Sequence, residues 1–243
     1  MAGIVTTPRT EELTFEADGF ALRATLHLPA ARQPPVVIGC HGLLSDRRSP
    51  KQVALAEACT AQGVAYLRLD HRGCGESAGR FEDAASLEAR LNDVLQALRL
   101  IESRPDLGKR IGLFGSSMGG AVCLEVASRR KVEALVTFAA PVRSLTLKHT
   151  PLAAGSGADR VRMESILKED FDVGAALGQI RRVLVVHGEV DLIVPPSHAR
   201  EIFAGVQEPK RLIIQPGSDH LMSDTRHQSD FMREAAQWFR RFL

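Results

Sequence analysis

A short glycine- and serine-rich turn is the part of the sequence whose spacing most directly suggests chemistry. Residues 115–119 match the pattern G-x-S-x-G, between an apolar run at 111–114 and a second apolar stretch at 121–127. A serine on a sharp strand-to-helix turn exposes its hydroxyl where free N–H groups and the helix dipole favour negative charge. Ser117 is therefore the candidate nucleophile for attack on a carbonyl carbon. The alternative is that Ser116 or Ser117 merely caps a helix, a common role for serine.

A serine hydroxyl also needs a base to take its proton and a third group to orient that base. Among the eight histidines, His220 is the candidate base, because it follows the apolar run at 212–215 and a turn, downstream of the nucleophile. Asp191 is the candidate acid, in the segment after the apolar run at 183–186. The chain order is then serine, aspartate, histidine, as this arrangement requires. Glu189 is the alternative carboxylate.

The other histidines fit structural or solvated positions better. His187 lies in a strand-end turn, His27 in an N-terminal hairpin and His227 just before the last helix. His187, Glu189 and Asp191 could in principle bind a metal, yet no H-E-x-x-H or similar ligand spacing supports this. We therefore expect no metal ion.

Acyl transfer places negative charge on the carbonyl oxygen, and two backbone N–H groups are expected to bind it. Met118, directly after the nucleophile, is one candidate donor. His41 and Gly42 end the apolar run at 36–40, and the next residue, Leu43, is the candidate for the second donor. His41 itself is expected to be structural.

The elements that must position these residues alternate along the chain. Period-two alternation at 12–16 and 21–28, joined by Asp18-Gly19, predicts an antiparallel hairpin. Later apolar runs fit strands covered on both faces, and apolar residues at helical spacing separate them. The strand runs are 36–38, 64–67, 111–114, 134–138 and 183–186, and the helical faces include residues 87–101 and 231–242. This order predicts an α/β fold with a doubly wound, mostly parallel sheet and a site at the carboxyl ends of its strands.

The chain is expected to form one domain over residues 1–243. Residues 142–181 interrupt the alternation of strands and helices, and they contain several aliphatic residues and the flexible Gly155-Ser-Gly157. We interpret residues 142–181 as a small cap inserted over the site. The aliphatic residues favour a substrate with a small or medium apolar group.

Composition excludes several classes of protein. The formal net charge is +2 and no run of five like charges occurs, so a nucleic-acid partner is not indicated. The four cysteines have no C-x-x-C spacing, which favours reduced structural thiols. No basic leader or apolar run of about 18 residues is present, so a cytoplasmic protein without a membrane span is expected. No pattern indicates an oligomeric state.

Taken together, these motifs resemble those of the α/β-hydrolase superfamily, particularly its small-capped carboxylesterase, feruloyl-esterase-like and monoglyceride-lipase-like members. The resemblance covers nearly the whole chain and is carried by His41-Gly42, residues 70–77, residues 115–120, residues 187–191 and residues 217–220. It implies an α/β-hydrolase fold with an antiparallel N-terminal hairpin. It also implies a serine hydrolase that cleaves a carboxylic ester or related acyl bond of a small molecule through an acyl-enzyme.

The resemblance implies further that Asp70 and Arg72 hold loops together without reacting. The glycine spacing of residues 73–79 departs from the dinucleotide fingerprint, so no nucleotide cofactor is expected. The serine at position 117 disfavours the aspartate-nucleophile branch of dehalogenases and epoxide hydrolases. A thioesterase, a peptidase, a lysophospholipase and a C–C hydrolase are alternatives with the same triad. A catalytically silent binding protein is the rival from another class.

Overall fold

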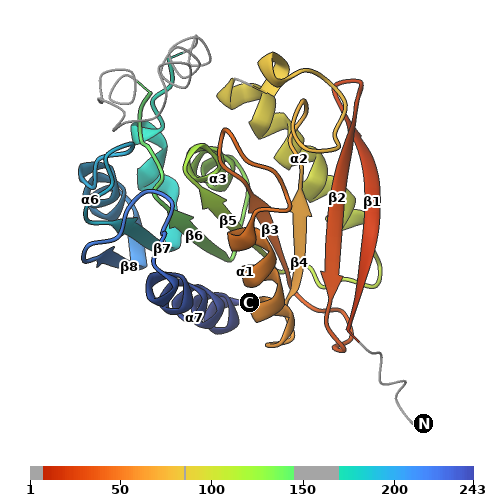
Figure 1. The fold of residues 1–243 in the computed structure, drawn as a ribbon. Helices are drawn as coiled ribbons and strands as arrows, with labels where there is room; N and C mark the ends of the chain where they lie inside the picture. Colours follow the sequence, from red (N-terminus) through yellow and green to blue (C-terminus); the bar gives the residue numbers. More distant parts are fainter. Residues whose placement is uncertain (1–7, 85, 145–169) are drawn as a thin grey trace.

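The computed structural model describes residues 8–84, 86–144 and 170–243, which form a single eight-stranded sheet flanked by helices (Figure 1). The strand order is β1-β2-β4-β3-β5-β6-β7-β8. β1 and β2 are antiparallel to each other, β2 is antiparallel to β4, and the remaining neighbours are parallel. The strands are β1 (Arg9–Ala17), β2 (Phe20–Leu28), β3 (Val36–Cys40), β4 (Ala65–Leu69), β5 (Ile111–Ser116), β6 (Ala134–Phe138), β7 (Arg181–Gly188) and β8 (Gln207–Gln215). The predicted fold class is confirmed.

The N-terminal hairpin turns at Asp18 and Gly19, as the sequence predicts. Their φ angles are 49° and 81°, so both residues lie in the left-handed region that a two-residue turn between twisted strands requires. Gly19 adopts this conformation without the steric cost of a side chain. The hairpin extends the parallel sheet at one edge and lies away from the carboxyl ends of β5, β7 and β8.

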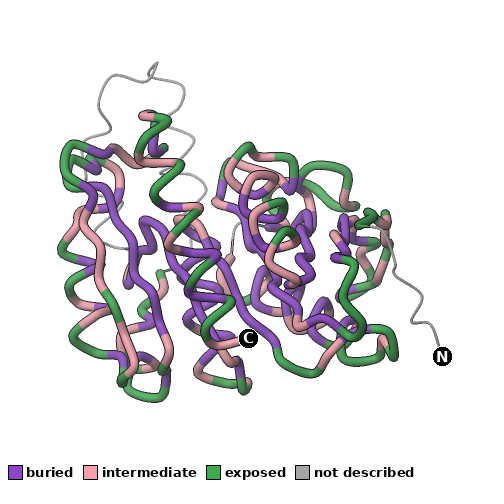
Figure 2. Tube along the Cα trace, turned by 90° about the horizontal axis from the view of Figure 1, so that it is seen from below, coloured by how far each residue is buried: buried purple, intermediate pink, exposed green. Residues whose placement is uncertain are grey.

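Helices cover both faces of the sheet. Buried residues of α1 and α7 pack in one apolar cluster with β6, while α2, α3 and α6 contribute to a second cluster on the other face. The central strands β3, β4 and β6 are buried along their whole length, whereas the edge strands β1 and β8 are only partly buried, and Figure 2 shows the buried segments inside the molecule with exposed segments around them. The helices are α1 (Pro50–Thr60), α2 (Leu87–Ser103), α3 (Met118–Arg129), α6 (Ser197–Gly205) and α7 (Thr225–Phe242), with the short helices η1 (Phe81–Ala84) and η2 (Gly174–Gln179). None of these described helices is long and apolar enough to cross a membrane.

The proposed cap at residues 142–181 lies largely outside the described residues, because 145–169 are not described. Its two described ends lie side by side. Ser144 N donates to Phe171 O at 3.0 Å, and Phe171 N donates to Ser144 Oγ at 3.0 Å. The two ends of the inserted segment are therefore next to each other. That the segment covers the site stays a prediction.

Three buried or half-buried histidines use a ring nitrogen lone pair to accept a hydrogen bond. The pairs are His27 Nε2 with Arg68 Nε (2.9 Å), His41 Nε2 with His71 N (3.2 Å) and His198 Nδ1 with Val142 N (3.0 Å). A protonated ring would turn each acceptor into a donor that faces another donor. Burial accordingly lowers the pKa of all three, that of His27 to about 4 with a further contribution from the Arg68 charge.

We expect these histidines to make the fold sensitive to acid. Between pH 6.5 and 4 the unfolded chain binds a proton at residue 27 that the folded chain does not bind, so stability is present above pH 6.5 and is lost as the pH falls. In His27→Gln the amide oxygen accepts from Arg68 at every pH. Urea unfolding at several pH values should show a shallower loss in the variant, by on the order of 1 kcal/mol after screening. If the free energy of unfolding fell equally with pH in the unaltered protein and in His27→Gln, this role would be contradicted.

Candidate active site

Ser117 lies at the turn between β5 and α3, as predicted, in a backbone conformation that side chains rarely adopt. Its φ and ψ are 51° and −123°, and this conformation is strained for a residue with a Cβ. Two backbone hydrogen bonds hold it there: Ser117 N donates to Phe138 O, and Gly120 N donates to Ser117 O, each at 2.8 Å. The helix begins at Met118, so Ser117 stands at its N-terminus.

The glycines of this turn are required by close backbone contacts. A Cβ at Gly115 would collide with the carbonyl of Gly119, and a Cβ at Gly119 would collide with the carbonyls of Cys40 and His41. A Cβ at Gly42 would lie 3.5 Å from that of Ser117. The first turn of α3 is therefore packed directly against the end of β3 and the loop that follows it.

His220 and Asp191 are joined by a hydrogen bond, with His220 Nδ1 2.8 Å from Asp191 Oδ2. The other carboxylate oxygen, Oδ1, accepts from the backbone N–H groups of Ile193 (2.9 Å) and Val194 (2.8 Å). Because Asp191 Oδ2 accepts a hydrogen bond from Nδ1–H, the neutral imidazole has Nε2 free to accept a proton. The side chain of Asp191 is buried, while that of His220 is 13% exposed.

A second imidazole also lies against Asp191. His187 Nε2 is 2.8 Å from Val194 O, to which it donates, and 3.3 Å from Asp191 Oδ2. Burial alone raises the pKa of Asp191, but hydrogen bonds from His187 and His220 outweigh it and hold the pKa well below its usual value. Asp191 is thus charged throughout the neutral range. Glu189, the alternative carboxylate, instead accepts from Gly217 N at 3.0 Å.

The two predicted oxyanion donors lie on either side of the β3–α3 contact. Neither Leu43 N nor Met118 N donates to any residue in the described part of the chain. Their side chains are buried together in a small apolar cluster that includes Phe81 and Phe171. Two backbone N–H groups therefore remain available beside Ser117.

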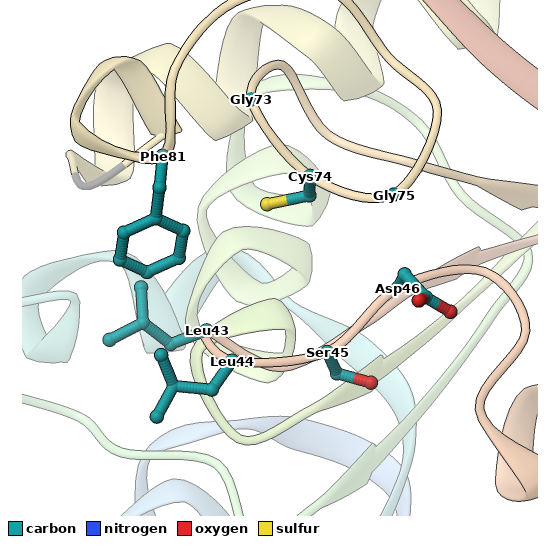
Figure 3. Close-up of a pocket in the computed structure, with 8 residues that line it drawn as sticks. All are labelled: Leu43, Leu44, Ser45, Asp46, Gly73, Cys74, Gly75 and Phe81. Atoms are coloured by element: carbon teal, nitrogen blue, oxygen red, sulfur yellow. The ribbon is translucent and has the colours of Figure 1, made fainter. Parts of the chain in front are cut away.

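A pocket of about 350 Å³ opens beside the loop of Leu43 (Figure 3). Leu43, Leu44, Ser45 and Asp46 form one wall, Gly73, Cys74 and Gly75 form another, and the Phe81 ring points toward the two leucines. Leu44 is also one of four large apolar side chains exposed in the described residues. The others are Val190, Leu192 and Leu221, which are sequence neighbours of Asp191 and His220. All four of these exposed apolar side chains therefore belong to loops that carry candidate site residues.

Ser117 and His220, both described residues, make no hydrogen bond to each other within 3.5 Å. The structure does bring them to one edge of the sheet, because Ser117 follows β5, Asp191 follows β7 and His220 follows β8. The two loops after β7 and β8 are tied together by Val190 N, which donates to Ser218 O at 3.0 Å.

Two charged residues near the site were missed by the sequence analysis. Lys51 Nζ lies 3.9 Å from the centre of the Phe138 ring, and burial lowers its pKa to about 8 despite the nearby charges of Asp191 and Asp219. No local pattern marks Lys51. Arg90, by contrast, falls on the apolar face of the predicted helix at 87–101, and a charge on such a face is a signal of a buried role.

The fold and the serine at its strand-to-helix turn define an α/β-hydrolase. The chain belongs to the Hydrolase_4 family, described as serine aminopeptidase, S33, whose model matches residues 32–161, more than half of the chain.

Among curated relatives, the mitochondrial palmitoyl-protein thioesterase ABHD10 of Rattus norvegicus is 36% identical over 216 residues, covering 79% of this chain and 70% of that protein. The uncharacterized protein YfhR of Escherichia coli (strain K12) is 28% identical over 171 residues, covering 68% of this chain and 56% of YfhR. The matched region thus spans less than two thirds of YfhR.

Two solved esterases share the fold. The esterase Pf2001 of Pyrococcus furiosus superposes with a TM-score of 0.82 at 18% identity, covering 97% of this chain and 92% of that one. Est1E from Butyrivibrio proteoclasticus, in a structure with bound ferulic acid, superposes with a TM-score of 0.78 at 23% identity, covering 95% and 98%. At these identities the likeness shows the fold.

The contact between α3 and β3 predicts a strong effect of one added methyl group. Gly119→Ala should lower the free energy of unfolding by about 1–3 kcal/mol, because its Cβ meets backbone atoms that cannot move aside cheaply. Gly178→Ala is the matched control, since nothing lies within 4 Å of its added Cβ. Urea unfolding of both variants checks this, and equal stabilities would contradict the packing described.

Proposed function

We propose that the protein is a serine hydrolase that cleaves a carboxylic ester, or a related acyl bond, with Ser117, His220 and Asp191 as its triad. The observation that carries the proposal is the hydrogen bond between His220 Nδ1 and Asp191 Oδ2, on loops at the sheet edge where Ser117 ends β5. A buried carboxylate that orients an imidazole with a free Nε2 is the arrangement that activates a serine hydroxyl.

In this mechanism His220 Nε2 takes the proton of Ser117 Oγ while Oγ attacks the carbonyl carbon of the substrate. The tetrahedral oxyanion accepts hydrogen bonds from the N–H groups of Leu43 and Met118. His220 then gives its proton to the leaving alcohol, and an acyl-enzyme forms. His220 next takes a proton from a water molecule that attacks this ester, and it gives the proton to Ser117 Oγ as the acid is released. Asp191 holds the tautomer and stabilises the imidazolium.

The missing direct hydrogen bond between Ser117 and His220 is compatible with this role. Catalytic hydrogen bonds are often long in unliganded enzymes and shorten when substrate binds. Rotation of the Ser117 side chain about its Cα–Cβ bond moves Oγ without any change in the strained backbone.

An apolar acyl or alcohol group is the substrate portion that the surroundings of the site favour. Leu44 and the three other exposed apolar residues would lose water on contact with such a group, at about 25 cal/mol per Å². A thioester is the second candidate bond, since a relative 36% identical to this chain is a palmitoyl-protein thioesterase. A peptide bond is the third, from the description of the family.

One substrate series separates these bonds. Hydrolysis rates are compared for p-nitrophenyl esters and for acyl-CoA thioesters of matched chain length, from acetyl to palmitoyl, and for aminoacyl p-nitroanilides. The proposal expects kcat/KM to rise with chain length from acetyl for the oxygen esters. Preference for the thioesters by a constant factor at every length would assign the second candidate.

Replacement of the nucleophile gives the first test of mechanism. Ser117→Ala should abolish turnover of p-nitrophenyl butyrate and labelling by a fluorophosphonate probe, because no hydroxyl remains to form the acyl-enzyme. The adjacent Ser116→Ala is the matched control and should retain both. Full activity of Ser117→Ala would refute the assignment, and absence of labelling in the unaltered protein would indicate a silent hydrolase fold.

Neutralising the acid gives the second test. Asp191→Asn should lower kcat by about a thousandfold to ten-thousandfold, because an amide does not hold the Nδ1–H tautomer or stabilise the imidazolium. Glu189→Gln, at the alternative carboxylate, should leave kcat within about twofold, since its contact is with Gly217 N and not with the imidazole. Steady-state kinetics of both variants checks the choice. The reverse ranking would make Glu189 the acid.

A further inference from the structure

Arg90 is a fully buried arginine on α2 whose five N–H groups point at backbone carbonyls and one thiol. Its contacts are Nε to Ala84 O (2.8 Å), Nη1 to His41 O (3.4 Å) and Gly42 O (3.3 Å), and Nη2 to Leu43 O (3.1 Å) and Cys74 Sγ (3.6 Å). Three consecutive carbonyls of the loop after β3 are thus held by a single guanidinium.

This charge is buried without a direct carboxylate partner. None of the ion pairs among the described residues includes Arg90, and the nearby Asp93 instead receives hydrogen bonds from Arg72 and contacts His71. Removing an unpaired cation from water costs several kcal/mol, and a well-packed apolar side chain at the same place would avoid that cost. Stability alone therefore does not account for an arginine at this position.

The contact with Gly42 acts on the proposed oxyanion donor through one peptide group. Gly42 C=O and Leu43 N–H belong to the same trans peptide and point in opposite directions. Because Gly42 O accepts from Arg90 Nη1 and also from His41 Nδ1 at 2.7 Å, the direction of the Leu43 N–H is set. A cation that donates to the oxygen also polarises the peptide, which makes its N–H a stronger donor.

The same guanidinium joins the walls of the pocket in Figure 3. Leu43 belongs to one wall and Cys74 to another, while Ala84 ends η1, the short helix that carries Phe81. Movement of Arg90 would therefore disturb the donor loop and the adjoining pocket together.

We propose that Arg90 is a positioning residue of the active site, which holds residues 41–43 so that the Leu43 N–H faces the oxyanion formed on Ser117. This inference rests on the proposed function, since it concerns the oxyanion of that reaction. Arg90 does not touch the reacting atoms and acts through the Gly42–Leu43 peptide.

The test compares Arg90→Lys and Arg90→Met with Arg68→Lys as the matched control. Arg68 is also a buried arginine that donates to a backbone carbonyl, that of Arg47, but it does not contact residues 41–43. A lysine at position 90 keeps the charge yet lacks the planar fork, and methionine keeps much of the volume without charge. For each variant we measure kcat and KM with p-nitrophenyl butyrate, and inhibition by an alkyl trifluoromethyl ketone, which forms an oxyanion on the serine.

We expect both Arg90 variants to lose at least about tenfold in kcat, with KM within about threefold, because the lost interaction is with the transition state. Affinity for the ketone should fall by the same factor as kcat/KM. Arg68→Lys should lose stability but keep kcat and ketone affinity. All rates are counted per active site, after fluorophosphonate labelling to completion, so that partial unfolding does not imitate a catalytic loss.

Arg90→Ala with added guanidinium ion covers the case in which the larger substitutions fold poorly. Millimolar guanidinium should restore part of kcat per labelled site, and it should not affect Arg68→Ala.

Normal kcat and ketone affinity per site in the Arg90 variants would overturn the inference, as would a change in KM alone. If the unaltered protein neither turned over esters nor was labelled, the proposed function would fall together with this inference. If Ser117→Ala inactivated the protein but the Arg90 variants kept full activity, only the inference about Arg90 would be overturned.

Discussion

The contact between the first turn of α3 and the end of β3 is the constraint on which the rest of the site depends. Gly119 allows the helix to approach the carbonyls of Cys40 and His41, and Gly115 allows the strand to pass beneath the helix. This approach places Ser117 beside Gly42, and the residues that follow each of them in the chain, Met118 and Leu43, have backbone N–H groups without an acceptor in the described residues. In the proposed mechanism, a wider separation would take the Leu43 N–H away from Ser117 and remove one of the two donors to the oxyanion.

The loops after β3 and β4 lie outside the hydrogen-bonded strands of the sheet. Buried charged side chains hold them in place. Asp70 pairs with Arg47 and accepts its backbone N–H, while Asp93 accepts from the backbone and side chain of Arg72. These pairs fix the loops after β3 and β4, as the resemblance to the α/β-hydrolases implies for Asp70 and Arg72. Buried, fully hydrogen-bonded networks of this kind specify one arrangement of a loop more than they add stability.

The sequence was sufficient for the fold and for the placement of Ser117, because each signal is local. Apolar runs set the strands, and the glycines around Ser117 report a backbone conformation within five residues. The contacts of Lys51 and Arg90 could not be predicted, since they include residues far away in the chain: Leu43 lies 47 residues from Arg90, and Asp219 lies 168 residues from Lys51. The predicted run at 212–215 is the C-terminal part of the edge strand β8 (Gln207–Gln215), whose N-terminal half carries polar residues and a register shift opposite β7. Residues 145–169 of the predicted cap lie outside the described structure.

Asp191 shows how the candidate site keeps one buried carboxylate charged and fixed in orientation. Two backbone N–H groups and two imidazoles surround its carboxylate, so the hydrogen bonds that it accepts outweigh the cost of burial. His187 Nε2 donates to Val194 O and lies 3.3 Å from this carboxylate, and the His187 side chain is fully buried, whereas that of His220 is 13% exposed. In the proposed mechanism, the charge that appears on His220 during attack therefore meets a carboxylate already ionised and oriented. Little of the site then has to reorganise as the reaction proceeds, which is the condition under which fixed dipoles and charges lower a barrier.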